Sequence, residues 1–421
     1  MENPPRLPLI LCVVVGIGAL CAAQFGVVPE ISQDAPSAYV RLAALVLALV
    51  AWHLRPARSW RWLTIAGVLC TVPNLISLLA GGYSEGGWHL VVNAVARPLL
   101  FVGLLGAATY VWCAGGRQAG AALVAAVLVV PPMSGLVLTN VSPDAQDAVV
   151  VAALVLVGLT VVTAGRAGFS PAEVAAPRWR VTVAGAAAWV ATGIDHWWPA
   201  PPVAQIDLGD GIADFVAEMS RHYLYTGIAL LAVGVVAGAV AGPRVLVTGL
   251  TGGLVLGSVS ALITLTWIPA RLIDLPMVLP LFLAAVVLAA GVLLARSRFR
   301  ELLGAGLLGA AAVGLLLLYL GYDGDPTPEA TPVLVVIPLV IVFIGCLPVF
   351  ASLGSVLAPT GEAPAALAGV VTAIAGGTAG LANFASTDVV AGAGSGSPVL
   401  MVFLLVAAGL TVFGGRRWAR T

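Results

Sequence analysis

One arginine lies deep within an otherwise uncharged stretch of the sequence, where it could bind or move a charge. Arg97 stands seven residues into an apolar segment that begins near Leu90, and seven helical residues descend about 10 Å. An ionisable side chain at that depth in a membrane predicts a functional site. Pro98 would free a backbone acceptor one turn earlier, near Asn93. We predict that Arg97 and Asn93 bind a substrate or couple an ion; the competing interpretation is a structural arginine bonded to carbonyls of neighbouring helices.

Five further polar residues are weaker candidates for the same roles. Gln24, Asn74 and Asn383 lie within apolar segments, where amide side chains more often form hydrogen bonds between helices than ligand contacts. Asp195 and His196 stand together at the end of another segment, and the pair could titrate in the physiological pH range. The competing interpretation of the pair is ordinary solvation at the membrane surface.

Other chemistry is not recognisable in the sequence. It contains no metal-ligand spacing, phosphate-binding loop or Ser-His-Asp constellation. The five cysteines have no paired spacing typical of a disulfide or a metal site. We therefore expect no cofactor, no metal, no nucleic-acid partner and no enzymatic activity.

The composition determines which elements can position these residues. Of the 421 residues 60% are hydrophobic and 9% charged, whereas soluble domains carry roughly 25% charged residues. The chain must therefore lie in lipid, where all backbone polar groups are satisfied within helices or closed barrels. Unbroken apolar runs of about 18–24 residues favour helices. The sequence predicts an all-α polytopic membrane protein whose main partner is the lipid bilayer.

About fourteen segments are long and apolar enough to be transmembrane helices. A short amphipathic helix is also expected on the outer surface at residues 206–219. The predicted spans are 7–28, 38–54, 63–82, 90–113, 118–139, 148–166, 181–199, 222–242, 245–268, 276–295, 302–321, 332–357, 364–386 and 397–414.

The arginines predict the orientation of these spans. With the N-terminus in the cytoplasm, all but four of the nineteen basic residues fall on the cytoplasmic side, the exceptions being Arg41, Arg97, Arg221 and Arg271. Both termini are then cytoplasmic. All nineteen basic residues are arginine, which suggests a high-GC bacterial genome. In a bacterium, we expect this multi-pass protein to lie in the plasma membrane.

Several short motifs resemble those of a known transporter family. Arg58 and Arg61, in the loop after the second span, match two arginines of the family's inner loop. The stretch from Arg97 to Gly103 resembles the arginine–glycine segment of the family's fourth span, and residues 129–135 resemble its antiporter motif. On these residues the chain resembles the fourteen-span, drug/proton antiporter-like branch of the major facilitator superfamily.

The resemblance implies an architecture and an activity. The expected parts are a six-helix bundle at 1–166, two extra transmembrane helices with an outer loop at 167–243, and a second six-helix bundle at 244–421. Alternating access between the bundles would export an apolar, amphiphilic or lipid-like small molecule, with Arg58 and Arg61 in a gating loop. Whether proton coupling accompanies export stays open.

Two other functions remain alternatives at this point. One is a non-transporting relative of the same fold, a scaffold or accessory subunit bound to a protein partner in a membrane complex. The other is a multi-span glycosyltransferase that uses a lipid-linked donor, for which Glu30 and Asp34 would supply the acidic residues of the first outer loop.

Overall fold

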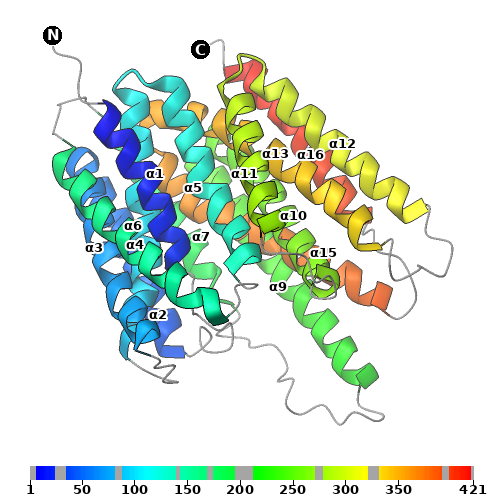
Figure 1. Ribbon diagram of the computed structural model, residues 1–421. Helices are drawn as coiled ribbons and strands as arrows, with labels where there is room; N and C mark the ends of the chain where they lie inside the picture. Colours follow the sequence, from blue (N-terminus) through cyan, green and yellow to red (C-terminus); the bar gives the residue numbers. More distant parts are fainter. Residues whose placement is uncertain are drawn as a thin grey trace.

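The chain folds into a bundle of long helices, seen in a computed structural model (Figure 1). The structure describes residues 6–23, 35–80, 88–138, 143–167, 174–194, 212–270, 278–320, 331–390 and 398–418, and these contain no β-strand. The helices are α1 Arg6–Ala22, α2 Ala35–Leu54, α3 Pro56–Leu79, α4 Trp88–Cys113, α5 Arg117–Leu138, α6 Pro143–Arg166, α7 Trp179–Ala191, α9 Ile212–Ala241, α10 Pro243–Ala270, α11 Val278–Arg296, α12 Arg300–Leu320, α13 Thr331–Leu357, η3 Ala358–Thr360, α14 Ala363–Ala365, η4 Ala366–Val371, α15 Thr372–Val390 and α16 Pro398–Trp418.

Eight helices of the described residues are long and apolar enough to cross a membrane: Pro56–Leu79, Trp88–Cys113, Asp147–Arg166, Ala217–Ala241, Pro243–Leu262, Arg300–Leu317, Ile337–Thr360 and Ala363–Ala385. Five others are apolar but shorter: Leu7–Ala22, Ala38–Leu54, Arg117–Pro131, Val286–Arg296 and Pro398–Gly414. Many large apolar side chains of these helices are exposed at the bundle surface, as expected where the surrounding medium is lipid. The prediction of a multi-pass helical membrane protein is therefore confirmed.

Every predicted span overlaps a helix of the structure. The prediction of a separate amphipathic surface helix is wrong. We expected a separate surface helix at 206–219, but residues from Ile212 onward belong to the 30-residue helix α9. Its amphipathic first turns therefore continue directly into the apolar part of the same helix. The start of α1 and the end of α16 lie at the same end of the bundle (Figure 1).

Tight turns join several helices, and glycines allow three of them. Gly115 between α4 and α5, Gly242 between α9 and α10, and Gly361 after η3 have φ values of 87°, 129° and 69°. Other residues adopt this left-handed region only at a cost. Between α2 and α3 a single residue, Arg55, separates the helices, and Pro56 opens α3 at a position where its missing N–H costs nothing.

The same pairings of helices occur twice in the molecule. In the first half, α1 contacts α4, α5 and α6, α2 contacts α4, and α3 contacts α4 and α6. In the second half, α10 contacts α13, α15 and α16, α11 contacts α13, and α12 contacts α13 and α16. If the six helices α1–α6 and the six helices α10, α11, α12, α13, α15 and α16 are each numbered from one to six in chain order, these pairings coincide, whereas the contact of α4 with α5 has no comparable counterpart between α13 and α15.

The helix pair α7 and α9 lies against the second of these sets. α9 packs on α15 and α10, while α7 packs on α9, on η4 and on α2 of the first set. Gly185 and Gly369 make the contact between α7 and η4 close, because a Cβ on Gly369 would overlap the backbone of Gly185. The two six-helix sets also meet directly, through α5 against α13 and α11.

Candidate functional site

A cavity of about 380 Å³ lies among helices of both six-helix sets and α7. Its volume falls in the range of about 300–1,000 Å³ that small-molecule sites occupy. The walls come from α1, α2, α4, α5, α7, α10 and α15. Its lining residues are Leu20, Arg41, Arg97, Pro98, Phe101, Val127, Leu128, Pro131, Trp189, Thr192, Leu256 and Thr372.

Arg97 lines this cavity and also binds a helix end. Its Nε donates to the carbonyl oxygen of Ala23 at 3.2 Å, and Nδ2 of Asn93 donates to the same oxygen at 3.1 Å. Ala23 directly follows α1, whose last carbonyls have no partner within their own helix. A cation at the carboxyl end of a helix is stabilising. One nitrogen of Arg97 therefore holds the end of α1, while the residue also lines the cavity.

Arg41 on α2 is a second cation at the cavity, one that sequence reasoning missed. From the sequence alone, Arg41 is one of the four arginines that do not fall on the cytoplasmic side, and at the outer end of its span its side chain could reach water. In the structure it lines the same cavity as Arg97, and the two guanidinium groups are close enough to interact electrostatically. One signal in the sequence could have linked Arg41 to Arg97. Each lies less than three turns from the start of its helix, and both helices are predicted to start on the same side of the membrane.

Trp189 on α7 also lines the cavity. Its Nε1 is buried and has no hydrogen-bond partner among the described residues. Its ring packs beside that of Phe101, with centroids 6.3 Å apart. Thr192 donates to the Trp189 carbonyl at 2.6 Å, and Thr372, just after the π-helix η4, donates to its own helix. The indole N–H of Trp189 thus lacks an acceptor in the described part of the chain.

The rest of the wall is apolar. Leucine, valine, proline and phenylalanine side chains make up the remainder of the lining, and no acidic residue of the described ranges belongs to it. A low-dielectric wall strengthens any interaction between the two arginines and an opposite charge. The arrangement suits a ligand with both a polar and an apolar part.

The other predicted site residues lie elsewhere or outside the described ranges. Asn74 is buried on α3 and Asn383 is half-buried on α15, and neither lines the cavity. Gln24, Asp195 and His196 lie outside the described residues, as do Glu30 and Asp34, on which the glycosyltransferase alternative depends.

The predicted gating arginines are placed at the start of α3. Arg61 donates from Nη2 to the carbonyl of Gly165 at 2.9 Å, and this carbonyl lies at the end of α6. Arg61 therefore joins two helices of the first set in the same way that Arg97 holds α1. Arg58 lies one turn earlier on α3 and does not line the cavity.

A second group of polar contacts lies at the opposite end of α2 from Arg41. Trp52 donates from Nε1 to the carbonyl of Gly361 at 3.0 Å. Arg178, just before α7, donates to both carboxylate oxygens of Glu362, from Nε at 2.5 Å and from Nη2 at 3.2 Å. Nη2 also reaches the carbonyl of Ala241 at the end of α9, at 3.4 Å. We call these contacts around Ala358–Glu362 the 358–362 junction.

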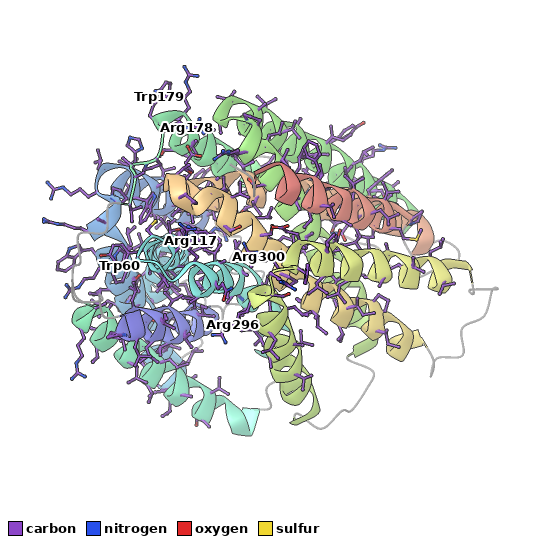
Figure 2. All side chains as sticks on the ribbon, turned by 90° about the horizontal axis from the view of Figure 1, so that it is seen from above. Trp60, Arg117, Arg178, Trp179, Arg296 and Arg300 are labelled. Atoms are coloured by element: carbon purple, nitrogen blue, oxygen red, sulfur yellow. The ribbon has the colours of Figure 1, made fainter. Side chains whose placement is uncertain are left out.

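Burial divides the charges of this junction unequally. Glu362 is 1% exposed, whereas the Arg178 side chain is 61% exposed. The hydrogen bond that Arg178 donates to the buried carboxylate of Glu362 raises the pKa of Arg178 above its ordinary value. Figure 2 looks onto the end of the bundle where α1 begins and labels Arg117, Arg178, Arg296 and Arg300 there. The arginines that begin or end helices thus gather at the end that carries the junction.

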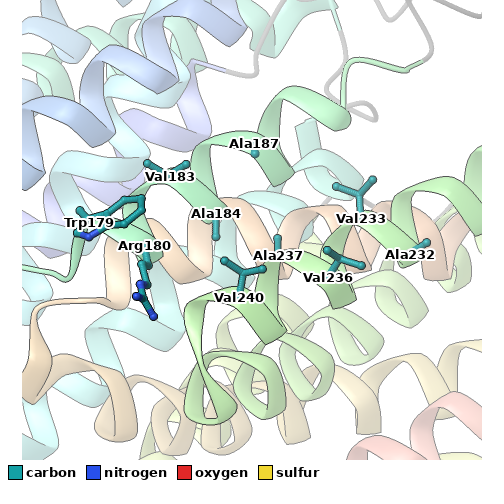
Figure 3. A pocket seen from close by; sticks show the side chains of 10 residues that line it. All are labelled: Trp179, Arg180, Val183, Ala184, Ala187, Ala232, Val233, Val236, Ala237 and Val240. Carbon is teal, nitrogen blue, oxygen red and sulfur yellow. The ribbon is translucent and has the colours of Figure 1, made fainter.

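A larger groove of about 670 Å³ lies on the surface between α7 and α9 (Figure 3). Its valine and alanine side chains face one another from the two helices, with Trp179 and Arg180 at one end. Val183 and Val236 are exposed, as is usual for side chains that contact lipid. The groove is therefore part of the membrane-facing surface, and the smaller cavity, which is lined by two arginines, is the better candidate site.

Among the described residues no group of three or more His, Cys, Asp or Glu side chains could hold a metal ion. No known protein-family model matches the chain, and no curated protein is significantly similar to it in sequence.

Proposed function

We propose that the protein is a secondary transporter of the major facilitator type, with fourteen spans and both termini in the cytoplasm, that moves an amphiphilic or lipid-like small molecule. The observation that supports this best is the cavity of about 380 Å³ walled by helices from both six-helix sets. Transporters built from repeated halves commonly place the substrate between the repeats, near the middle of the membrane. The recurrence of the same helix pairings in the two sets fits such a repeat.

In this proposal, the contacts of the 358–362 junction close the cytoplasmic side of the cavity. Trp52 lies eleven residues beyond Arg41 on α2, which is about 16 Å along the helix. The junction therefore lies well away from the cavity, at the arginine-rich end that we take as cytoplasmic. Opening toward the cytoplasm would separate Trp52 from Gly361 and Arg178 from Glu362. Closing would restore them, so the cavity would be open to one side at a time.

Filling the cavity tests the proposal. Val127→Trp puts a large side chain into the cavity wall, whereas Val236→Trp puts the same side chain onto the membrane-facing groove between α7 and α9. Both proteins would be reconstituted into vesicles, and flux would be measured with a panel of fluorescent and radiolabelled amphiphiles. We expect flux of at least one amphiphile in the parent and Val236→Trp proteins and its loss in Val127→Trp.

Two outcomes would overturn the transporter proposal. Equal flux in both variants would show that the substrate does not pass through the cavity. No flux of any compound by the parent protein, together with copurification of one stoichiometric partner, would favour the scaffold alternative instead.

A further inference from the structure

We propose that the cavity binds the anionic head group of an amphiphile, a carboxylate or a phosphate, between Arg41, Arg97 and Trp189. This inference rests on the proposed function, because it names the substrate class of the same cavity. It goes further in assigning the charge of the substrate and the three side chains that recognise it.

The charge of the cavity is the first argument. Arg41 and Arg97 both line it, and no acidic side chain of the described residues lies among the lining or within ion-pair distance of either arginine. Among the described residues, Arg97 donates from Nε to a neutral carbonyl, although a guanidinium offers five N–H donors. A carbonyl oxygen does not neutralise a positive charge. Two cations that share one low-dielectric cavity repel each other, and an anion placed between them removes that repulsion.

The geometry of the donors is the second argument. Arginine binds carboxylate and phosphate oxygens through its planar fork of N–H groups, so two arginines can hold two or three oxygens at once. Trp189 lines the same cavity, and its buried Nε1, which can donate but not accept, has no partner among the described residues. Buried donors without a partner are rare in folded proteins. All three groups donate, so the wall recognises oxygen acceptors and disfavours an ammonium head group.

The apolar remainder of the wall is the third argument. Leu20, Val127, Leu128 and Leu256 surround the polar groups, and such a wall gains free energy by covering hydrocarbon. An inorganic anion would leave this surface without a partner. A neutral hydrocarbon would leave two half-buried arginines without one. A molecule with an oxyanion at one end and a hydrocarbon chain at the other satisfies both parts of the cavity.

Binding to matched single-chain amphiphiles tests this inference. The full chain in nanodiscs of zwitterionic lipid would be titrated with dodecanoate, dodecyl phosphate and dodecyltrimethylammonium, with binding followed by native mass spectrometry. We expect dodecanoate or dodecyl phosphate, or both, to bind at least about tenfold more tightly than the cation. The carboxylate and phosphate arms distinguish a fatty-acid-like from a phospholipid-like source of the head group.

Three variants and one control assign the binding to the cavity. Arg41→Gln and Arg97→Gln should each weaken anion binding by about tenfold or more, since a hydrogen bond to a charged group contributes that factor. Trp189→Phe keeps an aromatic ring and removes the N–H donor, so it should weaken anion binding several-fold. This variant still tests the inference if an arginine variant fails to fold. Arg180→Gln, at the membrane-facing groove, should leave anion binding unchanged.

Equal binding of the cation and the anions would overturn the inference, as would unchanged anion binding in Arg41→Gln and Trp189→Phe. The outcome is separable from that of the transporter proposal. Transport of neutral or cationic amphiphiles that Val127→Trp abolishes would keep the transporter and refute the anion site. Anion binding that depends on Arg41 without any flux would keep the site and refute the transporter.

Discussion

The unequal burial of the ion pair at the 358–362 junction predicts that its two partners have unequal effects on stability. Arg178→Ala leaves the carboxylate of Glu362, which is 1% exposed, without its partner. Breaking a buried pair in this way costs about 3–5 kcal/mol when both charges are buried. Because the Arg178 side chain is 61% exposed, water screens the pair and replaces part of the lost interaction. We therefore expect the variant to lower the free energy of unfolding by about 1–3 kcal/mol.

The opposite change should cost less. Glu362→Gln keeps the shape of the side chain and one oxygen that can accept from Arg178, and the exposed guanidinium stays hydrated. We expect a loss of about 0.5–1 kcal/mol, the range of an ordinary hydrogen bond. In the double variant no buried carboxylate is left uncompensated, so its stability should exceed that of Arg178→Ala alone, although it carries one more substitution.

The measurement is thermal unfolding of the detergent-purified protein. It is monitored as the fraction that still elutes as folded, monodisperse protein after heating. The effect should not depend on pH near neutrality. The folded-state pKa of Arg178 is raised, so the stabilisation by its charge is fully present below the ordinary pKa of an arginine and is lost only as the pH rises through the higher folded value. Curves at pH 7 and pH 9 should therefore show the same difference between the parent protein and Arg178→Ala.

One result would refute this reasoning. If Glu362→Gln destabilised the protein as much as Arg178→Ala, or if the double variant were the least stable of the three, the cost would not arise from an unpaired buried carboxylate. Arg178→Lys, which keeps the charge but cannot donate to both oxygens in the same plane, should fall between the parent protein and Arg178→Ala.

Three further predictions concern packing, the junction and topology. Gly185→Ala places a Cβ against a carbonyl of α14 and should cost about 1–3 kcal/mol in thermal unfolding, whereas Gly158→Ala, with no atom within 4 Å of its Cβ, should be neutral or stabilising; similar losses would contradict the close contact of α7. Trp52→Phe removes the indole donor of the junction and should cost about 1 kcal/mol or more, while unchanged stability would mean that this bond contributes nothing. A cysteine at Ala114, in a background without native cysteines, should react in intact cells only with membrane-permeant maleimide, and one at Trp88 should react with the impermeant reagent as well; the reverse pattern would invert the proposed orientation.

Most of the fold was predictable because lipid leaves few alternatives. A chain that is 60% hydrophobic must pair its backbone groups within helices, so runs of apolar residues predict where helices lie. The exception near Ile212 has a physical reason. The amphipathic pattern before α9 marks a face, but it does not say whether the helix ends before the next apolar run. No proline stands within α9, so the two parts can form one helix.

The candidate site was predictable only in part. A charge within an apolar run is conspicuous whatever surrounds it, so Arg97 could be found from the sequence. Arg41 could not be distinguished from an arginine that reaches water, because that depends on which helices stand beside α2. Trp189 was missed because an indole within an apolar helix fits packing equally well, and only the surrounding helices leave its N–H without an acceptor.

The sequence by itself determined the solvent of this protein, the helical class of its fold, the approximate limits of its helices and the presence of one deep charge. These properties follow from local composition, because hydropathy and helix formation depend on residues near one another in the chain. Only the tertiary structure decided that Arg41, Arg97 and Trp189, on α2, α4 and α7, line one cavity. It also decided that Trp52 and Arg178 converge on the connection after α13. Such meetings depend on packing between helices far apart in sequence, which the alternation of apolar and polar segments does not specify.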